Sequence, residues 1–170
     1  MLKRFFSVFL VIILFIAGLW CFDRIYYRDR VPFLCPIELN GQEFRVRSDS
    51  YGSGYFGAKR NNGRRHKGLD ILSPVGTPVR AAKSGWAFAG EHPEGYGKYV
   101  EIFHPDGLSS VYAHLDEIKI GRIKRVRQGD IIGTAGKTGN ARYKGIKPHL
   151  HFEVRKDNIP QDPLKGYLKK

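Results

Sequence analysis

Cysteine is scarce in this chain of 170 residues, which contains only Cys21 and Cys35. Cys21 lies inside an apolar run, which argues against an intrachain disulfide framework. No Cys-x-x-Cys pair occurs, so a thiolate metal site is not indicated either. We expect Cys35 to be a free thiol near a surface, with an intermolecular disulfide at Cys35 as the alternative.

Acidic residues are also few, at 16 against 29 lysines and arginines, which gives a formal net charge of +13. Such an excess favours an anionic partner: nucleic acid, anionic lipid headgroups or an anionic wall polymer. Charge alone does not select among these three. Hydrophobic residues make up 42% of the chain, which indicates a globular core, and the length suits one domain with a short appendage.

Long amphipathic helices are absent after residue 30, and so are internal repeats and low-complexity tracts. Period-two segments instead recur between glycine-rich turns. Residues 98–104 and 108–115 flank Asp106-Gly107 and predict a hairpin. Further strands are expected at 77–81, 84–90, 130–134 and 149–155. The domain is therefore predicted to be all-β, with one small core.

One long hydrophobic run is present, at the N-terminus. Residues 5–22 carry no charge and follow Lys3 and Arg4. Their 18 positions are near the minimum for crossing a hydrocarbon core of roughly 30 Å. A cleavable signal peptide is the alternative, but Leu19 and Trp20 fit a small-residue cleavage site poorly. We expect an uncleaved transmembrane signal anchor, which would make the chain a single-pass protein of the cytoplasmic membrane.

These features divide the chain into expected parts. Residues 23–43 lack helical or strand periodicity and are too short for a second domain, so they are expected to be a tether. The complete division is a short cytoplasmic tail at 1–4, the anchor at 5–22, the tether at 23–43, the β domain at 44–166 and a basic tail at 167–170.

The histidines indicate the chemistry. His66 and Asp70 stand four residues apart in HKGLD, and both imidazole and carboxylate groups bind zinc. Alone this spacing is a weak indication, because a chance His-x-x-x-Asp is commoner than a site. His114, in YAHL, is expected to share a strand face with Tyr112 and Ser110. A lone strand histidine is more often structural, so its weight depends on the other motifs.

His149 and His151 stand two residues apart in PHLHFEV. Alternate residues of a strand share a face, so the two rings are expected to point the same way, about 7 Å apart, with Leu150, Phe152 and Val154 in the core. That spacing suits one metal ligand and one neighbour that acts on the metal-bound water. An amphipathic strand with incidental histidines is the alternative.

Taken together, His66, Asp70 and His151 are three candidate zinc ligands that leave a fourth position open for water. Catalytic zinc sites have this form, whereas a closed structural site carries four protein ligands. No His-Glu-x-x-His helix is present, so a glutamate base of the common metalloprotease type is not expected.

The motifs HKGLD, YAHL and PHLHFEVR occur in this order, separated by SPVGTPVRAAKSGWAFAG, GYGKYVEIFHPDG and QGDIIGTAGKTGN. In these motifs the chain resembles the lysostaphin/LytM-type zinc metalloendopeptidases, which act on peptidoglycan. The resemblance covers residues 45–163. It implies a small antiparallel β structure, a sandwich- or barrel-like hybrid with an open groove known as the duplicated hybrid motif, and one Zn²⁺ per chain.

The resemblance also implies roles for single residues. His66, Asp70 and His151 would bind zinc. His149 would act on the nucleophilic water together with His114, whose protonated form would stabilise the oxyanion. The implied function is a zinc-dependent endopeptidase that hydrolyses peptide crosslinks or stem-peptide bonds of bacterial peptidoglycan, in the periplasm or the extracellular wall space. Other cell-wall hydrolases are expected partners, and nucleic acid is not, because it leaves these residues unexplained.

The alternative function is a non-catalytic zinc-binding module that recognises peptidoglycan or activates another cell-wall hydrolase. The segment SDSYGSGYFGAKRNNGRRH resembles secreted animal chemotaxin-type relatives, which bind zinc without catalysis and lack part of the catalytic histidine set. Both His114 and His149 are present here, which favours activity. The bond that is cut stays open between D-Ala–diaminopimelate and glycine bridges. His92 and His104 are expected in solvated or turn roles, and Tyr96 is a weak candidate for lining the groove.

Overall fold

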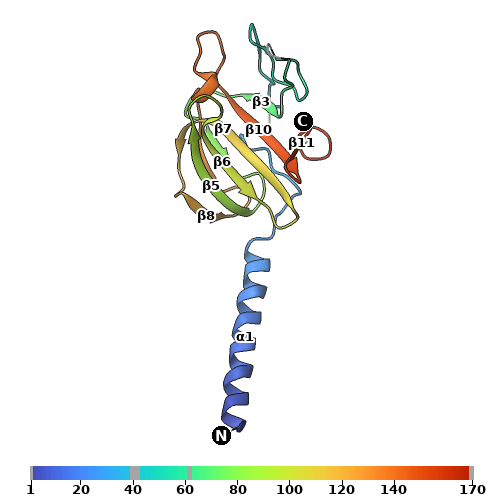
Figure 1. Cartoon of the computed structure of the whole chain (residues 1–170), viewed down its shortest axis with the longest axis vertical. Coiled ribbons are helices and arrows are strands. Elements are labelled where there is room, and N and C mark those ends of the chain that lie inside the picture. Colours follow the sequence, from blue (N-terminus) through green and yellow to red (C-terminus); the bar gives the residue numbers. More distant parts are fainter. Residues whose placement is uncertain (1, 39–42, 61–62, 169–170) are drawn as a thin grey trace.

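The computed structural model describes residues 2–38, 43–60 and 63–168. A long helix leads into a head built of strands (Figure 1). In chain order the elements are α1 (Leu2–Tyr26), β1 (Ser48–Asp49), β2 (Gly52–Ser53), β3 (Leu69–Leu72), β4 (Pro78–Arg80), β5 (Gly85–His92), β6 (Gly97–Phe103), β7 (Leu108–Ile118), β8 (Ile123–Val126), β9 (Ile131–Ala135), the 3₁₀ turn η1 (Gly139–Ala141), β10 (His149–Lys156) and β11 (Ile159–Gln161).

Within the described residues, nine strands form one sheet whose main path runs β11-β10-β7-β6-β5-β8. All of its pairings are antiparallel; β3 adds to β10, and β9 joins β7 to β4. The predicted hairpin is β6 and β7, and the prediction of an antiparallel β domain is confirmed. The sheet does not close on itself, since β8 and β11 end its path.

Strand β10 separates the apolar core from the polar cluster. Leu150, Phe152 and Val154 are completely buried in the core, as the alternation predicts. Burial of such side chains contributes about 1.5–3 kcal/mol each. His149 and His151 alternate with them and therefore lie on the opposite face of the sheet. The core fixes the register of β10 and, with it, the position of these two histidines.

The segment predicted to be a tether packs against the head. Phe33 and Ile37 belong to the hydrophobic core, at 9% and 5% exposure. The side-chain amide of Gln128 holds both backbone groups of Val31, accepting from its N–H at 3.2 Å and donating to its carbonyl at 2.7 Å. These contacts fix the described segment before residue 39 to the head. Residues 39–42 lie outside the described residues.

Helix α1 contains the run that was predicted to cross a membrane. Its described side chains from Val8 to Phe22 are exposed. Across the part of the chain that the structure describes, no helix combines the length and the apolar character that crossing a membrane requires. The predictions of a transmembrane anchor at 5–22 and of single-pass attachment to the cytoplasmic membrane are therefore wrong. The uncharged run has 18 residues, which is at the lower end of what a crossing helix requires.

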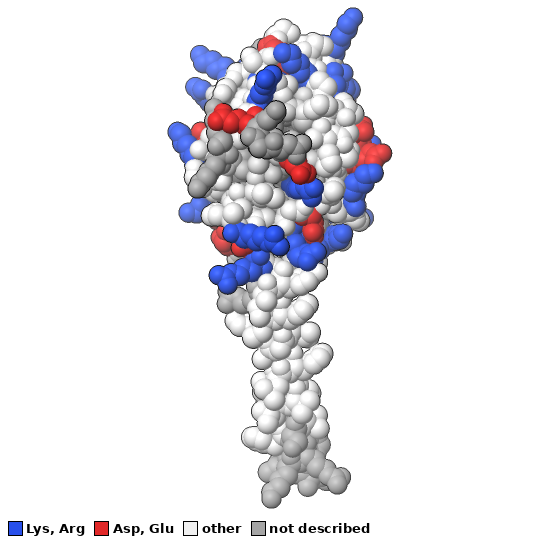
Figure 2. Space-filling view, turned by 180° about the vertical axis from the view of Figure 1, so that it is seen from behind, with Lys and Arg blue, Asp and Glu red and all other residues white. Residues whose placement is uncertain are grey.

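The visible charged side chains gather on the head. On the face shown in Figure 2, lysine and arginine side chains project around the head, while the described part of the helix shows none over most of its length. The basic side chains visible on this face therefore lie on the head.

Candidate metal centre and active site

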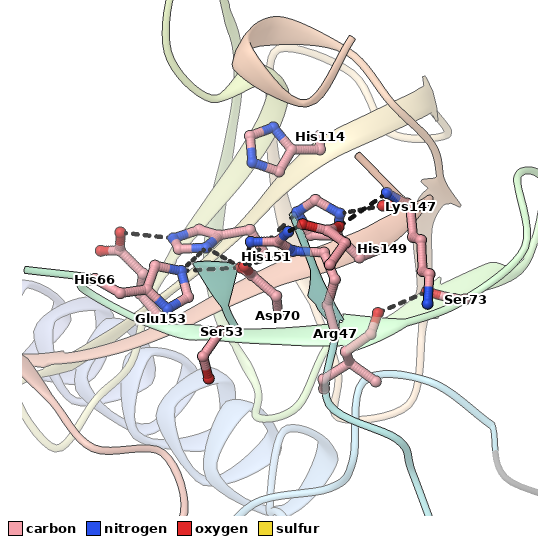
Figure 3. Close-up of polar contacts among 12 residues, drawn as sticks. Arg47, Ser53, His66, Asp70, Ser73, His114, Lys147, His149, His151 and Glu153 are labelled. Carbon is pink, nitrogen blue, oxygen red and sulfur yellow. Dashed lines mark hydrogen bonds and ion pairs between the residues drawn. The ribbon is translucent and has the colours of Figure 1, made fainter. Parts of the chain in front are cut away.

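Three candidate ligand atoms converge where β3 lies beside β10 (Figure 3). Asp70 and His151 are direct partners in this antiparallel pairing, and His66 lies just before β3. The Asp70 Oδ1 atom lies 2.7 Å from His151 Nδ1 and 2.9 Å from His66 Nε2. The two ring nitrogens are 3.0 Å apart. All three side chains are buried, so the sequence-predicted ligands form one cluster.

A glycine permits the close approach of the two strands at this point. A Cβ atom on Gly68 would lie 2.4 Å from the carbonyl oxygen of Phe152, much closer than atoms can pack. Glycine is therefore required two residues before Asp70. The spacing His-x-Gly-x-Asp thus serves the local backbone as well as the metal.

Each histidine of the cluster has its second ring nitrogen held by an acceptor. His66 Nδ1 donates to the carbonyl oxygen of Tyr55 at 2.9 Å. His151 Nε2 donates to Oε1 of Glu153 at 3.0 Å. A carbonyl or a carboxylate only accepts, so these contacts assign the tautomers. The nitrogens left for a metal, His66 Nε2 and His151 Nδ1, consequently both face Asp70.

This donor set fits zinc. Two imidazole nitrogens and one carboxylate oxygen are ligands that zinc takes in catalytic sites, where three protein ligands leave one position for water. Ligand atoms about 2.1 Å from a tetrahedral ion lie roughly 3.4 Å apart. The observed separations of 2.7, 2.9 and 3.0 Å are shorter than this value by less than about 0.8 Å. Small side-chain shifts would accommodate the ion.

The partners in the cluster decide its protonation. Burial opposes the charge of Asp70, but hydrogen bonds from His151 and His66 hold its pKa well below the usual range. Burial likewise opposes the charge of His151, yet hydrogen bonds to Asp70 and Glu153 raise its pKa to about 9. The pKa of His66 is lowered, chiefly by burial. Near neutral pH the proton of the cluster is therefore on His151, and a metal must displace it.

Two further histidine rings face this cluster. His149 donates from Nδ1 to the carbonyl of Lys147 at 2.7 Å, and its Nε2 lies 3.8 Å from Asp70 Oδ1. His114 donates from Nδ1 to the carbonyl of Thr138 at 3.0 Å. The two rings are 5.0 Å apart. In each ring the backbone contact is made by Nδ1, so Nε2 does not take part in it.

Both of these rings are neutral near pH 7. Burial is the main cause in each case: it lowers the pKa of His149 to about 4 and that of His114 well below its usual range. The expected protonated His114 is therefore not the resting form. A neutral ring whose Nδ1 donates to the backbone is a proton acceptor at Nε2.

His114 reaches the cluster through an unusual backbone conformation. The prediction that it shares a strand face with Tyr112 is wrong: Tyr112 lies in the core, where its hydroxyl accepts from the N–H of Ala82 at 2.8 Å. His114 has φ = 62°, in the left-handed region, and this turns its ring to the other face of β7. Its backbone N–H donates to the carbonyl of Tyr96 at 2.8 Å.

Comparison with known proteins agrees with this geometry. The model of peptidase family M23 matches residues 64–163, which contain all five of these site residues. The chain belongs to peptidase family M23.

Individual M23 relatives are similar over the head. The peptidoglycan DD-endopeptidase ShyC of Vibrio cholerae is 38% identical over 100 residues, which are 59% of this chain and 22% of that protein. A zinc-containing peptidase from V. cholerae superposes with a TM-score of 0.64 at 31% identity, over 84% of this chain and 41% of the other. A chain in the structure of the SpoIIQ–SpoIIIAH pore-forming complex superposes with a TM-score of 0.64 at 27% identity. The match covers 79% of this chain and 90% of the other. The chain spans about a fifth of the length of curated relatives such as ShyC.

Two charged residues of the M23 site were missed from sequence. Glu153, on β10, is completely buried against His151, and period-two alternation from His149 and His151 could have identified it. Arg47 is also buried, and its Nε and Nη2 atoms lie 3.1 and 3.0 Å from Asp70 Oδ2. No sequence pattern links Arg47 to Asp70, because their contact depends on tertiary pairing. The guanidinium leaves Oδ1 of Asp70 as the oxygen that faces the histidines.

The other histidines of the M23 chain serve elsewhere. His92 is exposed at the end of β5, as expected. His104 was expected in a solvated or turn role, but it is buried, with Nδ1 donating to the carbonyl of Ser84 and Nε2 bonded to Ser110 Oγ. Its role is therefore structural. Cys35 is half-buried and forms no disulfide among the described residues, so the free thiol stays a prediction.

Proposed function

We propose that this chain is a zinc-dependent endopeptidase that hydrolyses peptide crosslinks or stem-peptide bonds of bacterial peptidoglycan. The observation that carries the proposal is the convergence of His66, Asp70 and His151 beside the neutral rings of His114 and His149. Membership of a peptidase family and similarity to a peptidoglycan DD-endopeptidase support the reaction and the substrate.

In the proposed mechanism His66 Nε2, Asp70 Oδ1 and His151 Nδ1 hold the metal. Zinc bound there would supply a Lewis acid that makes water nucleophilic near neutral pH and polarises the scissile carbonyl. Arg47 keeps the second oxygen of Asp70 occupied, so that the carboxylate presents one oxygen to the metal.

The histidine pair moves the protons. His149, neutral and fixed through Nδ1 to a backbone carbonyl, accepts the proton of the attacking water at Nε2 and returns it to the leaving amine. His114 presents Nε2 to the same cluster, with its ring in edge-on contact with that of His149 at 5.0 Å between centroids. A proton on this ring turns Nε2 into a donor toward the negative charge that develops on the carbonyl oxygen. The net positive charge of the chain would retain it on the anionic wall.

Digestion of purified peptidoglycan tests the proposal. The full chain, loaded with zinc, is incubated with walls that carry either D-Ala–diaminopimelate or glycine-bridge crosslinks, and released fragments are identified by mass. Zinc-dependent release is expected, with the fragments naming the bond. His149→Ala should lower the rate about 10²–10⁴-fold while zinc stays bound.

The matched control is His92→Ala, which removes an exposed histidine away from the cluster and should leave the rate unchanged. A chelated sample should release nothing. Stoichiometric zinc with no cleavage of either wall would overturn the proposal and favour the non-catalytic recognition module.

A further inference from the structure

A buried carboxylate lies directly behind the metal-ligand candidate His151. Glu153 follows it on the same face of β10 and has no exposed surface. Its Oε1 accepts from His151 Nε2 at 3.0 Å and from the hydroxyl of Tyr96 at 2.7 Å. Its Oε2 accepts from Nε of Arg155 at 2.8 Å. Both oxygens are therefore satisfied, which a buried anion requires.

The groups around Glu153 hold its carboxylate in a single orientation. Tyr96 also accepts from Nη2 of Arg155 at 2.9 Å, so the carboxylate, the phenol and the guanidinium form a closed ring of contacts. The phenol ring stacks on His151, with centroids 5.9 Å apart at 27°. Arg155 is held in turn by Glu101 at 3.1 Å. The acceptor of His151 Nε2 is thus fixed by Tyr96 and Arg155.

A fixed anion at Nε2 determines what His151 can offer at Nδ1. With one proton held on Nε2, Nδ1 faces Asp70 and His66 and is the nitrogen that a metal takes when it displaces the second proton. Carboxylate partners of this kind fix the orientation and raise the basicity of metal-binding histidines. A ring without that acceptor is free to exchange tautomers or to rotate, and either change removes the lone pair from the cluster.

We propose that Glu153, clamped by Tyr96 and Arg155, is the positioning residue that sets the tautomer and orientation of His151 for zinc. This inference rests on the proposed function, because it assigns the cluster to that metal. Glu153 acts through His151 and takes no part in proton transfer to the substrate.

Zinc affinity and ring coordination test the inference on the full chain. Affinity is measured by competition with a chromophoric chelator, and the coordinating nitrogen of each histidine by ¹⁵N NMR of the zinc-loaded protein. Glu153→Gln keeps an oxygen of the same shape but removes the charge, and we expect about 10–100-fold weaker zinc binding. Tyr96→Phe removes one hydroxyl from the clamp and should give a smaller loss.

Glu38→Gln is the matched control, because it removes an ion-paired carboxylate that lies outside this clamp. It should bind zinc like the wild type. In Glu153→Gln the ¹⁵N spectrum should also show His151 leaving pure Nδ1 coordination, which a general loss of packing would not produce.

The outcomes separate the two proposals. A wild-type chain that binds no zinc overturns the proposed function and this inference with it. A wild type that binds zinc, with both Glu153→Gln and Tyr96→Phe matching its affinity and its Nδ1 coordination, overturns this inference alone. If Glu153→Gln does not fold, the Tyr96→Phe result decides, since that change removes a single oxygen atom.

Discussion

Asp70 is the residue on which the cluster depends, because its Oδ1 atom is close to both histidine ligand candidates. Asp70→Ala removes that oxygen and leaves the buried guanidinium of Arg47 without one of its two carboxylate partners. We expect this variant to lose bound zinc as well as hydrolysis. His149→Ala should lose hydrolysis alone. Metal content after dialysis measures the difference, and full zinc occupancy in Asp70→Ala would show that the ligands are wrongly assigned.

His151 links zinc binding to pH. Its pKa of about 9 exceeds the usual value of 6.5, so below pH 9 the ring is protonated and zinc must release that proton. Zinc affinity should therefore rise about tenfold per pH unit up to about pH 9 and level off above it. The lowered pKa of His66 adds no second proton near neutrality.

Calorimetry in buffers of different ionisation enthalpy checks this linkage. At pH 7.5 we expect release of about one proton from His151 for each zinc ion bound. Equal affinities at pH 6.5 and pH 8.5 would contradict the expectation.

At the scale of the elements, β7 is shaped by the left-handed backbone of His114. A non-glycine residue in this region is destabilised by about 1–2 kcal/mol. Alanine keeps that strain and glycine removes it. The free energy of unfolding of His114→Gly should therefore exceed that of His114→Ala by about 1 kcal/mol. Urea titrations of both variants measure the difference. In a strand with ordinary backbone angles, glycine is less stable than alanine. A His114→Ala variant more stable than His114→Gly would therefore refute the left-handed conformation.

Period-two alternation predicted most of the elements and part of the site. It gave the β6–β7 hairpin and placed His149 and His151 together, on the face opposite Leu150. It failed at His114, because a positive φ at a non-glycine residue breaks the alternation and leaves no mark in the sequence. Alternation could not predict the role of Arg47 either, because the contact between Arg47 and Asp70 forms only when β3 is folded into the sheet.

At the scale of the whole molecule, Phe33 connects the segment after the helix to the head. Its ring packs edge-on against Tyr167 and His104, at 5.2 and 5.8 Å between centroids. Phe33→Ala should lower the free energy of unfolding by about 3 kcal/mol, the lower end of the range for buried phenylalanines, because Phe33 lies at the margin of the core. Phe88→Ala, at a ring that is 38% exposed, is the control and should cost clearly less.

Chemical denaturation of both variants provides the measurement. Equal losses in Phe33→Ala and Phe88→Ala would mean that the segment does not contribute to the fold of the head. The sequence did not indicate this docking, because residues 23–43 have no periodicity. Whether an isolated apolar side chain is buried depends on the tertiary surface beside it. The anchor prediction rested on 18 uncharged residues, a length near the minimum for crossing, and the described helix does not combine the length and the apolar character that crossing requires.

The two strands that end the sheet's main path bear on how copies of the head behave when crowded. Strand β11 has three residues, and Pro160 at its centre lacks the N–H that a further strand would need. Strand β8 carries Lys124 and Arg125, which would repel the same positions of an approaching copy. Short edges interrupted by proline or charge resist the addition of foreign strands. Many copies gathered on one polymer should therefore stay separate molecules instead of joining edge to edge into fibres.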